Sequence, residues 1–478
     1  MSFRTSTASL HRRFDLVRRS LLQAPGLPFA DTLSAQQIQH AFDAEDVHFG
    51  DDDDEAIYTP PVTLWAILSQ MLFTGEQRSC VAAVVRVAAF YALLGRAVCS
   101  TNTGAYCRAR AKVAEGVPRR LTLQVARDCE PHVPASWRWK GRDVRVVDGT
   151  TFSMPDTAEN QAEYPQSTSQ AEGLGFPIMR AVALCSLATG MVMALACGPY
   201  AGKETGETAL LRTLFDALSR GDIVLGDRYY GGWFMLALLQ ASGVDFVSRL
   251  HQLGTADFVR GRRLGKGDHV ASWPKPERPE WMDQETYDRL PRQLEVREVL
   301  VNVDVPGFRT ESLVVITSLL DPKDYSRDDL ANLYRRRWVV ELHIRDIKTA
   351  MKLEVLRCKT PAMVRQELWT GLLVYNLIRQ SILQSAHETE RQPDELSFTA
   401  TMQMLANSWL LAAVVADRTG DVAEPLVRLR VIHGGSHRVG NRPDRVEPRA
   451  VKRRPKSHPL LTAPRGRAHA ALVAGGST

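Results

Sequence analysis

The sequence predicts an α/β protein whose central sheet is interrupted late in the chain. From 141 to 250 the apolar pattern changes from helical spacing to short β-branched runs, in the order strand, strand, strand, helix, strand, helix, strand. Residues 251–311 break this order with many Pro, Gly and charged residues and with period-2 apolarity, which predicts an inserted, mostly β subdomain. A return to the sheet at 313–319 and a long charged helix over 327–351 are expected after it.

Local signals set the elements of the first sheet region. A turn at Ala188-Thr189-Gly190 joins the second and third strands, and the first and fourth strands end at Asp148 and Asp227. The predicted strands are 144–147, 178–187, 191–197, 223–225 and 246–250, and the predicted helices between them are 204–218 and 233–241. Two acidic residues therefore follow directly after two short apolar strands.

The flanking segments complete the predicted domain organisation. Residues 1–60 are expected to be poorly structured, with an acidic linker at 51–55, and 61–140 are expected to form several helices of a DNA-binding region. Residues 312–420 should hold the remainder of the core and the C-terminal helices. The last segment, 421–478, is rich in Pro, Gly and Arg and is predicted to be a basic flexible tail.

One segment of the helical region has the composition of a DNA-contacting helix. Residues 100–113 place Arg108, Arg110 and Lys112 behind polar capping candidates. A helix that presents these cations suits DNA contact in the manner of a helix-turn-helix unit, and a plain surface helix fits the composition equally well.

Composition and charge indicate a globular protein with a polyanion-attracting end. The chain has 478 residues, of which 44% are hydrophobic and 24% charged, and a net charge of +6. From Arg428 onward there are 12 Lys or Arg and 2 Asp or Glu, so this end carries +10 and the rest −4. Seven cysteines without a C-x-x-C pair favour reduced thiols in a cytoplasmic protein. The apolar stretch 81–98 contains Arg86 and Arg96, which favours a core helix over a membrane span.

Three carboxylates stand in settings that suit metal-dependent phosphodiester chemistry. Asp148 in VRVVDGTTFSM and Asp227 in DIVLGDRYY follow strands, and Glu341 lies on the late helix in YRRRWVVELHIRDIK. Two strand-end acids and one helix acid can converge and hold two Mg²⁺ ions, and ions about 3.5–4 Å apart need carboxylates within about 4–8 Å of one another. The alternative is three unrelated surface acids.

The late helix also carries a stripe of phosphate-binding side chains. Tyr334, Arg337, Glu341 and Lys348 are offset by 3, 7 and 14 residues, which at about 100° per residue fall within roughly 60° of one another. A carboxylate flanked by a phenol, a guanidinium and an ammonium is a metal ligand beside phosphate donors. A solvated helix with incidental charges is the alternative.

These motifs resemble a known family. The spacing Y-x2-R-x3-E-x6-K is similar to that of DDE transposases of bacterial insertion sequences, whose catalytic domain has the ribonuclease-H-like fold. Asp148 with the following Gly-Thr-Thr resembles the first acid of that family, and Asp227 with Arg228 resembles the second. The segment 356–380 is also typical of it, and the resemblance covers residues 75–470.

The resemblance implies an enzyme that recombines DNA. Such a protein binds the terminal inverted repeats of its element as a homo-oligomer on double-stranded DNA, nicks a strand and joins the freed 3′ hydroxyl to target DNA. It uses two Mg²⁺ ions, for which Mn²⁺ substitutes, and it is cytoplasmic, nucleoid-associated and without a membrane partner. The implied catalytic and metal-binding residues are Asp148, Asp227 and Glu341, and the implied DNA contacts are Tyr334, Arg337, Lys348 and Arg228. In that fold the first and fourth strands are neighbours, so the two aspartates would meet.

Two other functions stay open from the sequence. One is a ribonuclease-H-like nuclease that cuts without joining, and the other is a catalytically silent DNA-binding protein derived from a transposase. The presence of all three acids argues against the second. In the insertion, Trp273 and Trp281 either stack on a flipped base or pack within the insertion itself.

Overall fold

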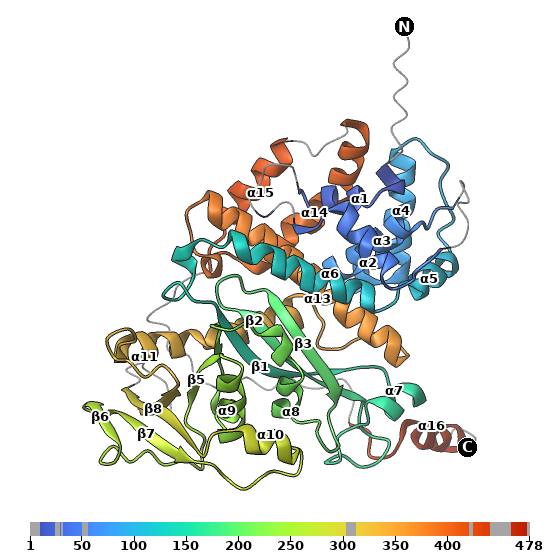
Figure 1. Cartoon of the computed structure of the whole chain (residues 1–478). Helices are drawn as coiled ribbons and strands as arrows, with labels where there is room; N and C mark the ends of the chain where they lie inside the picture. Colours follow the sequence, from blue (N-terminus) through green and yellow to red (C-terminus); the bar gives the residue numbers. More distant parts are fainter. Residues whose placement is uncertain are drawn as a thin grey trace.

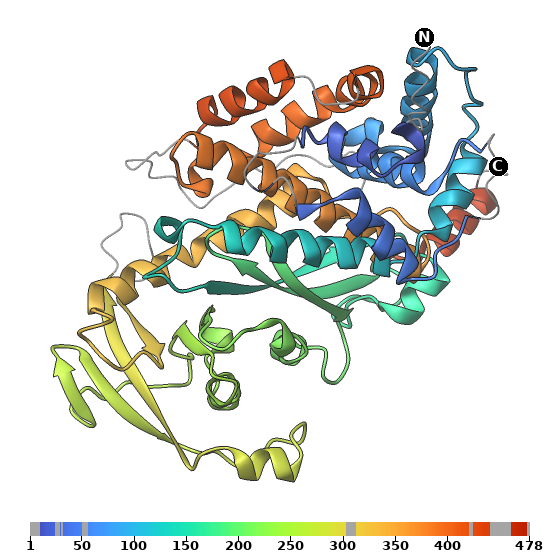
Figure 2. The same cartoon turned by 45° about the horizontal axis from the view of Figure 1, so that its top comes forward.

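The computed structural model describes residues 10–23, 29, 32–49, 56–302, 312–419, 424–439 and 460–475. A mixed sheet lies in the middle of the molecule, and helices cover both of its faces (Figures 1 and 2). The N-terminal helices and the helices between residues 361 and 436 gather together on one face, and the helices that connect the central strands lie on the other.

Within the described residues, nine strands form one sheet in the order β3-β2-β1-β4-β5-β9-β8-β7-β6. The strands are β1 (Val144–Ser153), β2 (Ile178–Ser186), β3 (Val192–Pro199), β4 (Ile223–Leu225), β5 (Asp245–Arg249), β6 (Arg262–Gly265), β7 (Asp268–Pro274), β8 (Gln293–Asn302) and β9 (Ser312–Thr317). β1 pairs antiparallel with β2 and parallel with β4, and β4 pairs parallel with β5. The first and fourth strands are therefore neighbours, as the family resemblance implied.

The insertion at 251–311 does not form a separate subdomain, which corrects the prediction. Strands β6, β7 and β8 pair antiparallel in succession, and β9 pairs with both β8 and β5. The insertion thus extends the central sheet, because β9 pairs with β5 along one edge and with β8 of the insertion along the other. A short helix, α10 (Gln284–Arg289), joins β7 to β8, and residues 303–311 lie outside the described part of the chain.

Alternation along β1 divides the core between the two faces. Val144 and Val146 belong to a large cluster with the terminal helices, whereas Val147 belongs to a second cluster with α8 (Glu207–Arg212) and α9 (Trp233–Ala241). The helices of the first face include α3 (Pro60–Leu72), α4 (Cys80–Leu93), α6 (Gly116–Cys129), α13 (Pro361–Glu388) and α14 (Phe398–Thr419). The same alternation puts Asp148 on the face of Val146 and Gly149 on the face of Val147.

The N-terminal segment is folded where it is described, contrary to the prediction for 1–60. Helices α1 (Asp15–Ser20) and α2 (Ala35–Asp43) bury Leu16, Val17 and Ile38 completely. These helices are too short to show a clear apolar period, and packing stabilises them, since α1 lies on α14 and α2 on α6. The predicted acidic linker at 51–55 lies outside the described residues.

The C-terminal segment is also partly ordered, so the predicted flexible tail over 421–478 needs correction. Helix α15 (Glu424–Ser436) packs on α13 and α14, and the fully buried Arg430 donates a 3.0 Å hydrogen bond to the carbonyl of Leu22. Helix α16 (Arg465–Gly475) follows, while 440–459, which holds most of the basic residues, is outside the described part. Two of the basic residues counted in the tail therefore lie on a packed helix.

Two apolar helices are core elements. Helix α4 covers most of 81–98, and its Arg86 is buried, donating to Ser69 and to the carbonyl of Gln77. Helix α14 is long and apolar enough to cross a membrane by length and composition, but 61% of its apolar window is buried inside the protein. Its contacts with α1, α3, α4 and α13 are those of a core helix.

Helix α5 (Thr103–Lys112) presents fewer cations than the sequence suggested. Arg108 and Lys112 are exposed, but Arg110 is buried and donates to Gln70 and Gln366. Arg110 is therefore a core residue that joins α5 to α13, and it is not available to a DNA partner.

Candidate active site

Asp148 lies within β1 and not at its end as predicted, because the ladder with β2 continues to Ser153. The parallel pairing with β4 is much shorter and stops at Val146↔Leu225. Asp148 is two residues beyond that last pair, where β1 no longer has a partner on the β4 side. Asp148 is thus in the middle of the long β1–β2 ladder but just beyond the end of the short β1–β4 ladder.

Asp227 stands at the same level on the neighbouring strand, two residues beyond Leu225. Its carboxylate caps a short 3-10 helix, Arg228–Tyr230, and accepts a 2.8 Å hydrogen bond from the Tyr229 N–H. Its carbonyl accepts a 2.6 Å hydrogen bond from the Ser248 hydroxyl. Equal offsets from one pair of parallel strands bring the two aspartates to one edge of the sheet.

The predicted helix over 327–351 is interrupted at Arg337. It consists of α11 (Arg327–Arg336), α12 (Trp338–Arg345) and one π-helical turn, Asp346–Ala350. Ser326 and Asp329 form a capping box that starts α11. Helix α12 packs against β1, which brings Glu341 to the side of the sheet that carries Asp148.

Arg337 connects the residues of the predicted stripe. Its Nη2 donates a 2.9 Å hydrogen bond to Oε1 of Glu341, and the two side chains are 15% and 35% exposed. The charges of Arg337 and Arg249 also act on Tyr334, whose pKa is raised because burial outweighs them. Arg337 and Glu341 are thus in contact, and Tyr334 lies near the same guanidinium.

The electrostatics of Asp148 link the three acids. The pKa of Asp148 is raised to about 6, mainly by burial and in smaller part by the charges of Glu341 and Asp227. The Gly149 N–H, at 2.9 Å, and the Arg337 guanidinium act in the opposite direction. The charges of Asp227, Glu341 and Arg337 therefore all act on Asp148.

The carboxylates of Asp148, Asp227 and Glu341 do not form a closed metal site in this structure. Among the residues that the structure describes, no three His, Cys, Asp or Glu side chains are grouped closely enough to hold a metal ion. Glu341 is instead held by Arg337, so a positive charge from the chain itself lies among the carboxylates.

Lys348 is not joined to this group. It lies in the π-helical turn, and its Nζ is 3.8 Å from Oε1 of Glu354. The prediction that Lys348 continues the stripe assumed about 100° per residue throughout, and a π turn changes that rotation. Arg228 is exposed directly after Asp227.

A family model described as "Transposase DDE domain" matches residues 139–377, which is half of the sequence and includes all three acids. The chain belongs to the DDE transposase family. Enzymes of this family cut and join DNA strands with divalent metal ions, and they are typically cytoplasmic proteins.

Individual relatives agree with this assignment. The transposase is 29% identical over 370 residues to "Transposase InsG for insertion sequence element IS4" of Escherichia coli (strain K12), covering 76% of this chain and 78% of that protein. It is 32% identical over 65 residues to "Transposase for insertion sequence element IS421" of Escherichia coli, covering 14% of this chain and 18% of the relative. A "Cryo-EM structure of piggyBac transposase synaptic complex with hairpin DNA" aligns over 93% of this chain and 89% of that one, at 9% identity and a TM-score of 0.43, too distant to assign a fold.

The sequence missed a carboxylate that packs behind the first acid of the transposase. The Glu207 side chain occupies the space beside Gly149, where a Cβ would lie 2.2 Å from its Cδ. It accepts a 3.1 Å hydrogen bond from the buried Tyr230 hydroxyl, whose pKa is raised by burial and by nearby Glu207, Asp148 and Asp227. The glycine after Asp148 was visible in the sequence, but nothing there linked it to residue 207.

The tryptophans have different surroundings. Trp273 donates a 2.8 Å hydrogen bond to Glu298 and packs in the second core cluster, whereas Trp281 is 36% exposed beneath the Arg212 guanidinium, at 3.7 Å. Trp338, which the sequence analysis did not single out, follows the helix break at Arg337 and is 47% exposed. Packing within the insertion therefore accounts for Trp273.

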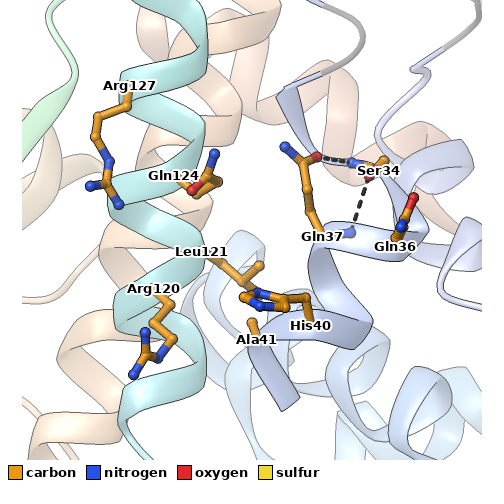
Figure 3. Close-up of a pocket in the computed structure, with 9 residues that line it drawn as sticks. All are labelled: Ser34, Gln36, Gln37, His40, Ala41, Arg120, Leu121, Gln124 and Arg127. Atoms are coloured by element: carbon orange, nitrogen blue, oxygen red, sulfur yellow. Dashed lines mark hydrogen bonds between the residues drawn. The ribbon is translucent and has the colours of Figure 1, made fainter. Parts of the chain in front are cut away.

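A surface cavity of about 380 Å³ lies elsewhere, between α2 and α6 (Figure 3). Arg120 and Arg127 line it from α6, and Ser34 and Gln37, which form the capping box of α2, line it from the other side. None of its lining residues is one of the predicted site residues, so the cavity is separate from the acids.

Proposed function

We propose that this transposase binds the terminal inverted repeats of an insertion sequence as a homo-oligomer, frees a 3′ hydroxyl and joins it to target DNA. The observation that carries the proposal is the register that puts Asp148 and Asp227 at equal offsets beyond the last β1–β4 pair, with α12, which carries Glu341, packed against β1. Acids from two neighbouring strands and one helix suit phosphodiester chemistry, and the family supplies the reaction.

We infer that the sheet is a ribonuclease-H-like core with an added edge. The strand order β3-β2-β1-β4-β5, with β4 and β5 parallel to β1, supports this inference. The insertion then adds β6 to β8 beyond β9.

Asp148, Asp227 and Glu341 would hold two Mg²⁺ ions, for which Mn²⁺ would substitute. An all-oxygen donor set fits these ions. Glu341 and Asp227 raise the pKa of Asp148 because like charges repel, and a bound cation would relieve that repulsion. When bound, the ions activate the attacking oxygen and stabilise the leaving oxygen. The backbone hydrogen bonds of Asp227 keep its carboxylate fixed while DNA enters.

Tyr334, Arg337, Lys348 and Arg228 would hold DNA phosphates beside the acids. Arg337 already contacts Glu341 and lies near Tyr334, and Arg228 is exposed beside Asp227. A guanidinium binds a phosphate through two parallel hydrogen bonds, so Arg337 also fixes its orientation.

The helical region 61–140 and the basic segment 421–478 would contact DNA outside the cleavage site and keep the protein with the nucleoid. Arg108 and Lys112 are exposed on α5, and residues after 439 contain nine Lys or Arg. Deleting residues 440–478 leaves α15 complete and should flatten the salt dependence of binding, by about 0.9 in log–log slope for each phosphate that the segment neutralises. An unchanged slope would show that the cleft and the helices carry the electrostatics alone.

A strand-transfer assay tests the function. Pre-cleaved duplexes that end in the element's inverted repeat are mixed with target DNA and Mg²⁺, and joined products are measured. Wild type should join the ends, and Glu341→Ala should bind the same duplex without cutting or joining. Asp328→Ala, an exposed acid on α11, is the matched control and should behave as wild type.

Two results would favour the other functions. Cutting of an uncleaved repeat duplex, with no joining of the pre-cleaved one, would indicate a nuclease. Repeat binding by wild type with neither activity would indicate a silent DNA-binding protein.

A further inference from the structure

The Arg337–Glu341 pair places a cation of the chain on the acid of the catalytic helix. The 2.9 Å hydrogen bond occupies Oε1 of Glu341, and the same guanidinium acts on Asp148 and Tyr334. A divalent ion bound by Glu341 would approach a carboxylate that already holds this cation. The guanidinium and the metal therefore compete for one carboxylate.

We propose that Arg337 is a switch that couples DNA binding to metal binding. In the DNA-free protein it holds Glu341, and on binding it transfers to a phosphate, which releases the carboxylate to the metal. The proposal rests on the proposed function, in which Glu341 is a metal ligand and Arg337 a phosphate contact. It adds that these two roles oppose one another until DNA arrives.

The strength of the pair suits such an exchange. It joins residues four apart on adjoining turns, with side chains 15% and 35% exposed, and pairs of this kind shift an equilibrium only by about two- to fivefold. A phosphate offers the guanidinium two charge-assisted hydrogen bonds. DNA can therefore take Arg337 from Glu341 at small cost.

The backbone at Arg337 also favours movement. Arg337 closes α11 and opens α12, and its N–H bonds to the Tyr334 carbonyl three residues back at 3.1 Å. The next helix begins in the same way, with the Val340 N–H on the Arg337 carbonyl at 3.1 Å. The residue lies at a junction between two helices, outside a continuous four-residue ladder, where a small backbone change reorients its side chain.

Both exchanges act on the same pair, so linkage requires that DNA and metal strengthen each other's binding. DNA draws Arg337 away from Glu341, which frees the carboxylate for the metal. The metal in turn occupies Glu341, which frees Arg337 for the phosphate. Removing the guanidinium should therefore tighten metal binding without DNA and reduce the effect of DNA on it.

Mn²⁺ titration by calorimetry tests this linkage in the full-length protein, alone and bound to a duplex of the element end. Wild type should bind Mn²⁺ more tightly with DNA. Arg337→Gln should bind Mn²⁺ about two- to fivefold more tightly than wild type without DNA, and DNA should add less. Arg335→Gln removes an equal charge from an exposed arginine on α11 that bonds Asn332, and it should match wild type.

DNA affinity in EDTA gives a second, independent measurement. Glu341→Gln frees Arg337 and should tighten metal-free binding of the duplex about two- to fivefold, whereas Asp328→Asn should not. An Arg337→Gln protein with the Mn²⁺ affinity of wild type, or a Glu341→Gln protein with unchanged DNA affinity, overturns the switch. If Glu341→Gln binds Mn²⁺ as wild type does in the presence of DNA, the metal site itself is wrong, which is a failure of the proposed function and not of the switch alone.

Discussion

Asp148 and Asp227 are held by the backbone of a sheet, whereas Glu341 is held by a salt bridge to a neighbour on its own helix. The aspartates sit at equal offsets from a paired register, and Asp227 also caps a 3-10 helix. The helix side has a break at Arg337 and a π turn after Arg345. The strand side of the site is therefore built in advance, and the helix side is free to adjust when DNA and metal arrive.

The largest effect should come from neutralising the strand acids. Asp148→Asn or Asp227→Asn should lower DNA cleavage by about a thousandfold or more, because several kcal/mol of metal-dependent stabilisation disappear. Asparagine keeps an oxygen that accepts the Tyr229 N–H, so the thermal midpoint of Asp227→Asn should change little. Asp156→Asn, an exposed aspartate after β1, is the control. A large fall in stability would show that the strand side depends on the charge for folding.

A second test concerns the packing behind the first acid. Gly149→Ala would push the Glu207 carboxylate away and leave the Tyr230 hydroxyl without its acceptor, lowering the free energy of unfolding by about 1–2 kcal/mol. Chemical denaturation measures this cost. In a Tyr230→Phe background the same change should cost less, because the hydroxyl is already gone. Equal costs in both backgrounds would mean that Glu207 does not support the strand side through Tyr230.

On the helix side, Lys348→Ala should have a moderate effect. Its ammonium lies 3.8 Å from Glu354 and is not joined to the acids, so its removal should lower end cleavage only about tenfold, mainly through weaker DNA binding. The log–log salt slope of binding should become shallower by about 0.9, the value for one phosphate. A fall in cleavage as large as that of the aspartate variants, at saturating DNA, would place Lys348 in the chemistry and contradict the comparison.

The smallest expected effect is the pH dependence contributed by Asp148. Burial raises its pKa from 3.8 to about 6, so the folded protein binds the proton more tightly than the unfolded chain. In metal-free buffer, stability should therefore fall as pH rises from about 4 to about 6, by about 1 kcal/mol after allowance for solvent screening. Asp148→Asn should lack this component of the unfolding curve. If the difference in unfolding free energy between wild type and Asp148→Asn did not vary with pH, the pKa of Asp148 would not be raised in the folded protein.

The strand side could be predicted from the sequence because its signals are local. Val144–Val147 and Ile223–Leu225 are short apolar runs that end near an acid, and strand order then makes them neighbours. On the helix side, the sequence predicted which residues the helix carries but did not predict its interruptions. Nothing at Arg337 or Asp346 breaks a helix by propensity, so the break and the π turn depend on tertiary packing.

The remaining differences also come from contacts between distant residues. Leu16 and Val17 form too short an apolar pair to predict a helix, and they are buried because α14 covers them. Glu207 lies far along the chain from Gly149, and only the folded sheet brings them together. Sequence patterns within about a dozen residues predicted individual strands and helices, but the sequence did not show which distant segments pack together.

The contact of the first helices with α14 has a consequence for the synthesis of the protein. The Leu10 N–H donates to Oδ1 of Asp417 at 3.2 Å, across 407 residues of sequence, and Arg430 reaches Leu22 in the same bundle. At about 5–20 residues per second, a ribosome needs roughly 20–80 s to make the partners of the first helices after those helices emerge. The N-terminal bundle cannot close until translation is nearly complete, so a nascent or prematurely terminated chain lacks the covered core of the finished enzyme.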